Sequence, residues 1–183
     1  MKIDTMRRVD YLAGIPLCFI ASLWVQLTGW FGRAVSGKPA RVLFVELSEM
    51  GSAILVDPAM RRIQQDTGCE LYFVIFRSNA VSLRLLATVP EKNVFTISDG
   101  GLLTLVVDSL RYLWWTRQQG IDTVIDLELF SRYSALLTGL SGASRRVGFH
   151  PFHNEGLYRG AMLTHRVAYN PHQHIAKNFV ALV

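Results

Sequence analysis

Acidic and hydroxyl side chains gather at the ends of two separate apolar runs of the sequence. The first run starts at residue 41 and the second covers residues 122–127. Counted with the other candidate residues beside them, the first group is Glu46, Ser48, Glu49, Met50, Gly51 and Ser52. The second group is Asp126, Glu128, Ser131 and Arg132. If both runs are neighbouring strands of a parallel sheet, four carboxylates converge on the edge where such sheets bind ligands. These residues are therefore the first candidates for binding and catalysis.

Several cofactor motifs are absent from this region. The loop after the first run holds a single glycine, Gly51, so it contains neither the G-x-G-x-x-G pyrophosphate fingerprint nor the G-x-x-x-x-G-K-[ST] phosphate loop. NAD binding and P-loop phosphoryl transfer are therefore disfavoured. The pairs His150 and His153, and His172 and His174, have neither a neighbouring cysteine nor a His-Glu-x-x-His pattern. We expect neither a metal site nor a cofactor.

The elements that would position these residues alternate between strands and helices. Short runs rich in β-branched and aromatic residues predict strands, and apolar residues three or four positions apart predict helices. The expected strands are 41–47, 70–76, 93–97, 122–127 and 145–149, and the expected helices are 52–65, 80–87, 102–119 and 131–140. Such alternation with almost continuously apolar strands indicates a parallel sheet covered on both faces. The predicted fold class is α/β, a doubly wound, Rossmann-like parallel sheet.

The first forty residues differ from the rest. No charged side chain occurs from residue 11 to residue 32, about the length of one membrane-spanning helix, and basic residues flank this segment on both sides. Glycine, proline and polar residues interrupt it, so a helix lying on the membrane and anchored by Trp24, Trp30 and Phe31 fits as well as a span. A cleavable signal peptide and a packed soluble helix are further alternatives. We expect residues 1–40 to form an apolar membrane-associating segment, including an apolar helix, and a linker.

Composition narrows the classes of protein and partner. Hydrophobic residues make up 50% of the 183 residues and charged residues 18%, against about 25% in typical domains, which excludes intrinsic disorder. The length suits one domain or half of a two-domain enzyme. The net charge of +5 suits an anionic partner such as a phosphorylated lipid, a nucleotide or a nucleic acid. Cys18 and Cys69 form neither a disulfide framework nor a CxxC site, so we expect a reducing compartment, the cytoplasm.

Several segments together resemble the N-terminal half of glycosyltransferase family nine, the ADP-heptose:lipopolysaccharide heptosyltransferases and their relatives. The segments are residues 44–52 (FVELSEMGS), residues 57–59 (DPA), Asp122-x-x-x-Asp126 and residues 146–149 (RVGF). The resemblance covers about residues 41–183 and rests on the order and spacing of these segments.

The resemblance implies a GT-B architecture, in which two Rossmann-like domains face a cleft. Residues 41–183 would be the N-terminal, acceptor-binding domain, and a C-terminal domain that holds most of the nucleotide-sugar donor would be absent. The implied reaction transfers a heptose-like sugar to a lipid-linked, lipopolysaccharide-type saccharide acceptor, with inversion and without a metal. The implied location is the cytoplasmic face of the inner membrane, where an anionic membrane surface would be a further partner and nucleic acid would not. This chain alone would be inactive.

The sequence departs from the family where the catalytic base is expected. Family members typically carry Met-Gly-Asp after the first strand, with the aspartate as candidate base, whereas Ser52 stands at the matching position here and Glu46 replaces a frequent lysine. A hydroxyl cannot serve as that base unaided, so Glu49 is the first candidate and Asp126 the second. A non-catalytic, membrane-attached saccharide-binding domain is the alternative that Ser52 supports. As ordinary structure, Ser52 would be a helix cap and Glu49 an exposed loop acid.

Other residues are candidates for contact with the substrate. They are Met50, Gly51, Glu128, Ser131, Arg132 and Arg146. Acids at strand ends also cap neighbouring helices, which is the alternative for Glu128. The two arginines, together with Arg145 and Arg159, would pair with phosphate or carboxylate groups of an acceptor, or else form a solvated basic surface.

Overall fold

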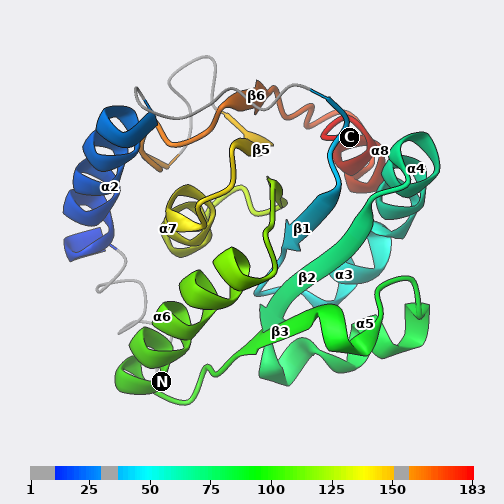
Figure 1. Cartoon of the computed structure of the whole chain (residues 1–183), viewed down its shortest axis with the longest axis horizontal. Helices are drawn as coiled ribbons and strands as arrows, with labels where there is room; N and C mark the ends of the chain where they lie inside the picture. The colour runs from blue at the N-terminus through cyan, green and yellow to red at the C-terminus, as the bar shows by residue number, and fades with distance from the viewer. Residues whose placement is uncertain (1–10, 30–36, 151–156) are drawn as a thin grey trace.

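The fold is built on one six-stranded parallel sheet. A computed structural model describes residues 11–29, 37–150 and 157–183, so the proposed anchors Trp30 and Phe31 lie outside the described residues. The strands are β1 (Arg41–Val45), β2 (Glu70–Phe76), β3 (Val94–Ile97), β4 (Thr123–Asp126), β5 (Arg145–Phe149) and β6 (His165–Val167). Their order is β3-β2-β1-β4-β5-β6, and each neighbouring pair is parallel (Figure 1). The predicted doubly wound α/β fold is confirmed.

Helices cover both faces of this sheet. They are α2 (Gly14–Gly29), α3 (Met50–Leu55), α4 (Asp57–Thr67), α5 (Val81–Leu86), α6 (Leu102–Gln118), α7 (Arg132–Leu140) and α8 (Ile175–Val180), with short 3₁₀ turns at Arg77–Asn79 and Glu91–Asn93. Successive side chains of a strand point to opposite faces. Val42 and Phe44 accordingly pack under α3, α4, α5 and α8, whereas Leu43 and Val45 pack under α6 and α7. Both faces are apolar because both are covered.

The helix predicted at residues 52–65 is in fact two helices. The first, α3, ends at Leu55, and α4 starts at Asp57 with Pro58 in its first turn. Proline lacks an amide hydrogen and disfavours helical backbone at the residue before it, so it starts a new helix more readily than it continues one. The two helices have partly different neighbours: α3 packs against α5 and α8, and α4 packs against β2 and α8.

Beyond residue 149 the sequence predicts only an apolar, helix-like run at residues 174–183. In the structure this part of the chain adds β6 at the edge of the sheet, next to β5, and α8 against α3 and α4 (Figure 1). The side-chain amide of Asn178 donates to the carbonyl of Asn170, 3.0 Å away, and the amide of Asn170 donates to the Asn178 side chain at 2.9 Å. These two bonds hold α8 against the loop that leads to it.

The N-terminal helix α2 packs on the outer side of α7. Its small side chains allow a close approach: Cys18 is fully buried, and the hydroxyl of Ser22 accepts from the amide of Ala161 at 2.8 Å. Gly160 has a φ of +77° and no room for a Cβ next to Ser22, so glycine is required there. Among the described residues, no helix combines the length and the apolar character needed to cross a membrane.

Candidate functional site

A cleft lies at the carboxyl ends of β1 and β4, where the order of the sheet reverses. The connections from β1 and from β4 lead to helices on opposite faces of the sheet, which opens a crevice at this point. The cleft has a volume of about 520 Å³. Its lining residues come from the β1–α3 loop, α3, the β4–α7 loop and the C-terminal segment. They include Glu46, Ser48, Glu49, Gly51, Ser52, Glu128, Tyr169, Ile175 and Phe179.

Glu128 ties the two loops together. One of its carboxylate oxygens accepts from the amides of Leu47 and Ser48, at 3.0 and 3.1 Å, and from the Ser48 hydroxyl at 2.9 Å. On the other side of the loop, the amide nitrogen of the Asn79 side chain donates to the carbonyl of Leu47 at 2.9 Å. Hydrogen bonds from several donors to one ionised group are among the strong ones in proteins. The tip of β1 is therefore fixed before any ligand arrives.

Glu49 and Ser52 form a hydrogen-bonded pair at the mouth of the cleft. The hydroxyl of Ser52 donates to the carboxylate of Glu49 over 2.9 Å. Glu49 is exposed and stands at the N-cap position of α3, although its side chain does not cap the helix, and Ser52 lies in the first turn. Ser52 is therefore not the N-cap residue that its sequence position suggested. The contact orients a solvent-accessible carboxylate.

Asp126 is buried below the cleft in an ion pair. Its side chain is 1% exposed and receives a hydrogen bond from the guanidinium of Arg159. The hydroxyl of Ser134 donates to the same carboxylate at 3.3 Å, and the amide of Glu128 donates at 3.1 Å. Burial raises the pKa of Asp126 to about 6, against the opposing effect of Arg159. Asp126 does not line the cleft, and it anchors the β4–α7 loop.

Glu46 is the second buried carboxyl at this edge. It is 3% exposed, and its carboxylate accepts from the amide of Glu49 at 3.3 Å. Burial, reinforced by the nearby charge of Glu128, raises the pKa of Glu46 to about 8. A group with this pKa carries a proton for much of the time at neutral pH. At neutral pH the cleft is therefore less negative than its number of acids suggests.

The other predicted residues are divided between the cleft and the scaffold. Gly51 lines the cleft, and Met50 is exposed beside it. Ser131 accepts from the amide of Ser134 at 3.1 Å and thereby caps α7. Arg132 is 5% exposed and donates to the carbonyl of Tyr158.

Arg146 lies apart from the other candidates. Its guanidinium donates to the carbonyl of Met162 at 2.7 Å and to that of Ala143. Neither Arg132 nor Arg146 lines the cleft, so the structure does not bring these two arginines to the carboxylates.

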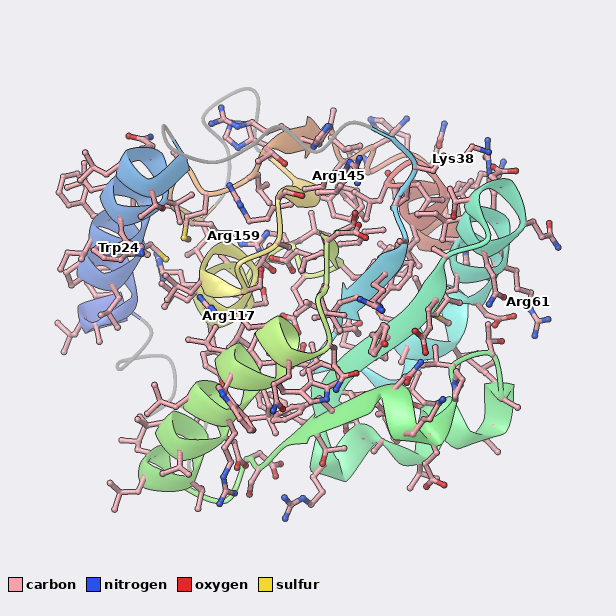
Figure 2. The ribbon with its side chains drawn as sticks, in the orientation of Figure 1. Trp24, Lys38, Arg61, Arg117, Arg145 and Arg159 are labelled. Atoms are coloured by element: carbon pink, nitrogen blue, oxygen red, sulfur yellow. The ribbon has the colours of Figure 1, made fainter. Side chains whose placement is uncertain are left out.

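Sequence reasoning missed two contributions to the site. The first is the wall formed by Tyr169, Ile175 and Phe179, which only the return of the C-terminal segment brings to β1 and β4. The second is the pairing of Arg159 with Asp126, 33 residues earlier; Figure 2 shows Arg159 beside α7. The available signal was the apolar run at the end of the sequence, which had to be buried against something.

The chemistry of the cleft favours hydroxyl groups over anions. Three carboxyl groups line it, and none of its described lining residues is a lysine or an arginine. Carboxylates accept hydrogen bonds from hydroxyls and repel phosphate. Among the described residues, no three His, Cys, Asp or Glu side chains are grouped so as to hold a metal ion. The site can therefore orient a polyhydroxyl ligand and take a proton from it at Glu49.

The fold of this site recurs in solved glycosyltransferases. The chain superposes on the Escherichia coli heptosyltransferase WaaC bound to ADP-2-deoxy-2-fluoro heptose, with a TM-score of 0.64 and 20% identity over 78% of this chain and 46% of WaaC. The complex of WaaC with ADP gives a TM-score of 0.63. A family 9 glycosyltransferase from Veillonella parvula gives 0.59, with 14% identity over 80% of this chain and 41% of that protein.

These comparisons are structural. No family model matches the sequence, and a search of curated proteins gives no match. The chain spans less than half the length of the solved structures on which it superposes. These 183 residues thus have the Rossmann-like fold found in part of the GT-B glycosyltransferases of family nine.

Proposed function

We propose that this chain is the acceptor-binding domain of an inverting, metal-independent glycosyltransferase. The reaction would move a heptose-like sugar from a nucleotide-sugar to a lipid-linked, lipopolysaccharide-type saccharide. The fold supports the enzyme class, and the ADP-heptose analogue bound by WaaC supports the donor class. The single observation that carries the proposal is the accessible Glu49 carboxylate, held by Ser52 in a cleft at the reversal point of the sheet.

In this mechanism Glu49 accepts the proton of the attacking acceptor hydroxyl. The hydroxyl oxygen forms a bond to the anomeric carbon of the donor while the bond from that carbon to the diphosphate oxygen breaks. The nucleoside diphosphate leaves with the bonding electron pair, and the attack from the opposite side inverts the anomeric centre. A base within hydrogen-bond reach of the hydroxyl suffices for this step. Glu128 and Asp126 position the loops and do not themselves accept the proton.

Binding measurements test the assignment of this domain to the acceptor. Calorimetric titration of the chain with a deacylated lipopolysaccharide core oligosaccharide should give saturable binding. Titration with ADP-heptose should give at most weak binding, because the donor would be held mainly by a second domain. Tight, specific binding of ADP-heptose and none of the oligosaccharide would contradict the proposal.

The alternative function is a non-catalytic saccharide-binding domain derived from such an enzyme. It is favoured by Ser52, which stands where family members typically carry the catalytic aspartate. Both functions predict oligosaccharide binding, so a transfer assay must separate them. The assay would use the enzyme in which this domain is joined to a donor-binding domain. Transfer that Glu49→Gln abolishes supports the enzyme, and no transfer with intact oligosaccharide binding supports the binding domain.

We further propose that the protein works at the cytoplasmic face of an anionic membrane. Eight large apolar side chains of residues 11–29 are exposed, among them Trp24 at 61% (Figure 2), and the net charge is +5. Apolar contact and electrostatic attraction together bind such segments to anionic lipid surfaces. The intact chain should float with vesicles that contain phosphatidylglycerol, and removal of residues 1–38 should release it. Full solubility of the intact chain in the presence of these vesicles would contradict this proposal.

A further inference from the structure

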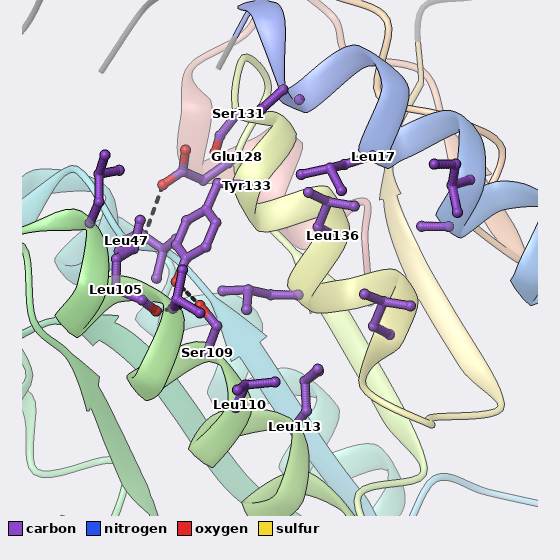
Figure 3. Close-up of a pocket in the computed structure, with 18 of the residues that line it drawn as sticks. Leu17, Leu47, Leu105, Ser109, Leu110, Leu113, Glu128, Ser131, Tyr133 and Leu136 are labelled. Carbon is purple, nitrogen blue, oxygen red and sulfur yellow. Dashed lines mark hydrogen bonds between the residues drawn. The ribbon is translucent and has the colours of Figure 1, made fainter. Parts of the chain in front are cut away.

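A second and larger cavity lies on the other face of the sheet, between α2, α6 and α7. Its volume is about 830 Å³, within the range of about 300 to 1,000 Å³ that is typical of small-molecule sites. Figure 3 shows leucines of α6 facing Leu136 of α7, with Leu17 of α2 on the far side. We call this cavity the α2–α6 groove. It is a preformed space between three helices that the proposed reaction does not use.

The walls of the α2–α6 groove are almost entirely apolar. Among the described lining residues, Glu128 alone is charged, and it lies at one end together with Ser48 and Ser131. The hydroxyls of Ser109 and Tyr133, further along the wall, are 2.7 Å apart and hydrogen-bond to each other. An occupant of the groove therefore meets hydrocarbon along its length and hydrogen-bonding groups at one end.

The groove is open to solvent along its apolar length. Ile20 of α2 is 60% exposed, and Val106 and Leu110 of α6 are 56% and 63% exposed. Contiguous exposed apolar side chains of this kind mark an interaction surface or a ligand-binding groove. The occupant must also bring few polar groups of its own into the groove, because the described hydroxyls between its ends, those of Ser109 and Tyr133, already bond to each other. A hydrocarbon chain meets this condition, whereas an extended peptide, with its backbone amides and carbonyls, does not.

The dimensions agree with one lipid chain. The residues of α6 that line the groove run from Leu102 to Leu113, a stretch of about 18 Å along the helix. A lipid chain that fills one leaflet spans about 15 Å, half of the hydrocarbon core of a bilayer. One wall of the groove is thus long enough to cover such a chain from end to end.

The polar end of the groove joins the carboxylate cleft. Ser48 and Glu128 line both cavities. A molecule with its hydrocarbon chain in the groove would place its head group at Glu128, beside Glu49. Because no described lining residue of either cavity is basic, a head group rich in hydroxyls fits this junction better than a phosphate.

We propose that the α2–α6 groove binds one hydrocarbon chain of the acceptor lipid and thereby delivers the saccharide head group to the carboxylate cleft. The assignment of this lipid as the acceptor rests on the proposed function. The binding of an alkyl chain with a sugar head group in the groove does not depend on turnover.

The test uses n-alkyl maltosides with chains of eight, ten and twelve carbons, below their micelle-forming concentrations, and the intact chain. Titration calorimetry should give saturable binding, with affinity rising about fourfold for each added methylene group. Quenching or enhancement of Trp24 fluorescence, with Trp24→Phe as the blank, should report occupancy, because Trp24 lines the groove. Absence of saturable binding, or affinity that does not depend on chain length, overturns the proposal.

Matched charge substitutions on α6 locate the site. Leu110→Glu places a charge in the groove and should weaken dodecyl maltoside binding at least tenfold. Leu103→Glu changes a leucine on the same helix that is 84% exposed and does not line the groove, and it should leave the affinity within about twofold. An equal loss in both variants overturns the proposal, since it would indicate general adsorption to an apolar surface. Sedimentation that shows a dimer dissociated by Leu110→Glu also overturns it.

Failure of the groove and failure of the proposed function give different results. Equal transfer rates to acylated and deacylated acceptor would remove the role of the groove and leave the enzyme assignment intact. Alkyl maltoside binding that Leu110→Glu abolishes, without any transfer activity, would remove the enzyme assignment and leave the groove as a lipid-chain site.

Discussion

The carboxylate cleft and the α2–α6 groove lie on opposite faces of the same sheet, yet they share Ser48 and Glu128. The cleft gathers three carboxyl groups, while the groove presents hydrocarbon with one charged residue at its end. The contrast arises just past the end of β1 at Val45, where the backbone of Glu46 and Leu47 still pairs with β2, so that their side chains point to opposite faces as in a strand. Glu46 faces the cleft, and Leu47, the next residue, faces the groove. Two adjacent residues of the chain thus contribute to an acidic site and to an apolar one.

The two regions also differ in how firmly they are held. The loop at the cleft is tied by hydrogen bonds from Leu47, Ser48 and Asn79. The groove is bounded by α2. The described contacts between α2 and the rest of the chain include the hydrogen bonds of Ser22 and Cys18 and apolar packing. Charge-assisted hydrogen bonds fix the positions of the cleft residues, as proton transfer requires. Apolar packing, by contrast, allows a bound hydrocarbon chain to shift along the groove. The difference suits a reaction centre on one face and a lipid chain on the other.

The largest effect on the cleft should come from Glu49→Gln. If Glu49 is the base, the turnover number of the enzyme with both domains should fall by about 100- to 10,000-fold, while oligosaccharide affinity is unchanged. Glu91→Gln, an exposed acid on another loop, should leave turnover intact and serves as control. A near-normal turnover number for Glu49→Gln would reject the assignment. If the turnover number fell only in Asp126→Asn, the base would be Asp126, at the end of β4.

The next largest effect should come from breaking the buried ion pair below the cleft. Arg159→Met should lower the free energy of unfolding by about 3 to 5 kcal/mol at pH 8, because it leaves Asp126 buried without its partner. This loss of unfolding free energy should be smaller at pH 5. That pH lies below the pKa of about 6, so Asp126 is mostly protonated there and no longer needs a charged partner.

Urea denaturation of an exposed pair provides the comparison. Arg62 and Asp66 lie 3.7 Å apart on the surface of α4, so Arg62→Ala should cost less than about 1 kcal/mol. Similar losses in the two variants would show that Arg159 and Asp126 do not form the anchor described above.

A third effect follows from the pKa of Glu46, which burial raises from 4.5 to about 8. Between these pH values the folded chain holds a proton that the unfolded chain releases. The contribution of Glu46 to stability is therefore complete below pH 4.5 and is lost as the pH rises towards 8. Glu46→Gln is neutral at every pH in this window. Relative to the original chain, its free energy of unfolding should therefore rise between pH 4.5 and 8, by about 4 kcal/mol at the upper end. Urea denaturation of both proteins at pH 4.5 and pH 9 tests this. The prediction is wrong if the difference in free energy of unfolding between Glu46→Gln and the original chain is the same at both pH values.

The smallest effect is expected for Ser52→Ala. The substitution removes one hydrogen bond to Glu49, worth about 1 kcal/mol of stability, and should leave turnover within about threefold. Stability by urea denaturation and transfer rate would be measured on the same preparation. A loss of turnover as large as that of Glu49→Gln would mean that Ser52 takes part in accepting the proton.

Local patterns predicted most of the secondary structure. The bounds predicted for the strand at 41–47 and the helix at 102–119 differ from the observed bounds by at most two residues. These predictions succeed because a run of apolar residues and helical spacing are both visible among residues close together in the sequence. The break between α3 and α4 was also present in the sequence, as Asp57-Pro58, although the apolar spacing on either side concealed it. The strand β6 has three residues and leaves no periodic signal of its own.

The sequence by itself determined the parallel sheet and the edge at which the four carboxylates gather, because strand alternation and strand ends are local properties of the chain. Only the tertiary structure decided what each acid does. Asp126 is paired because Arg159 folds back over it, whereas Glu49 is exposed and, among the described residues, receives a side-chain hydrogen bond from Ser52. The α2–α6 groove likewise exists only because α2 packs beside α7, more than a hundred residues later in the chain. Periodicity cannot report contacts over such separations, since they depend on how whole elements pack.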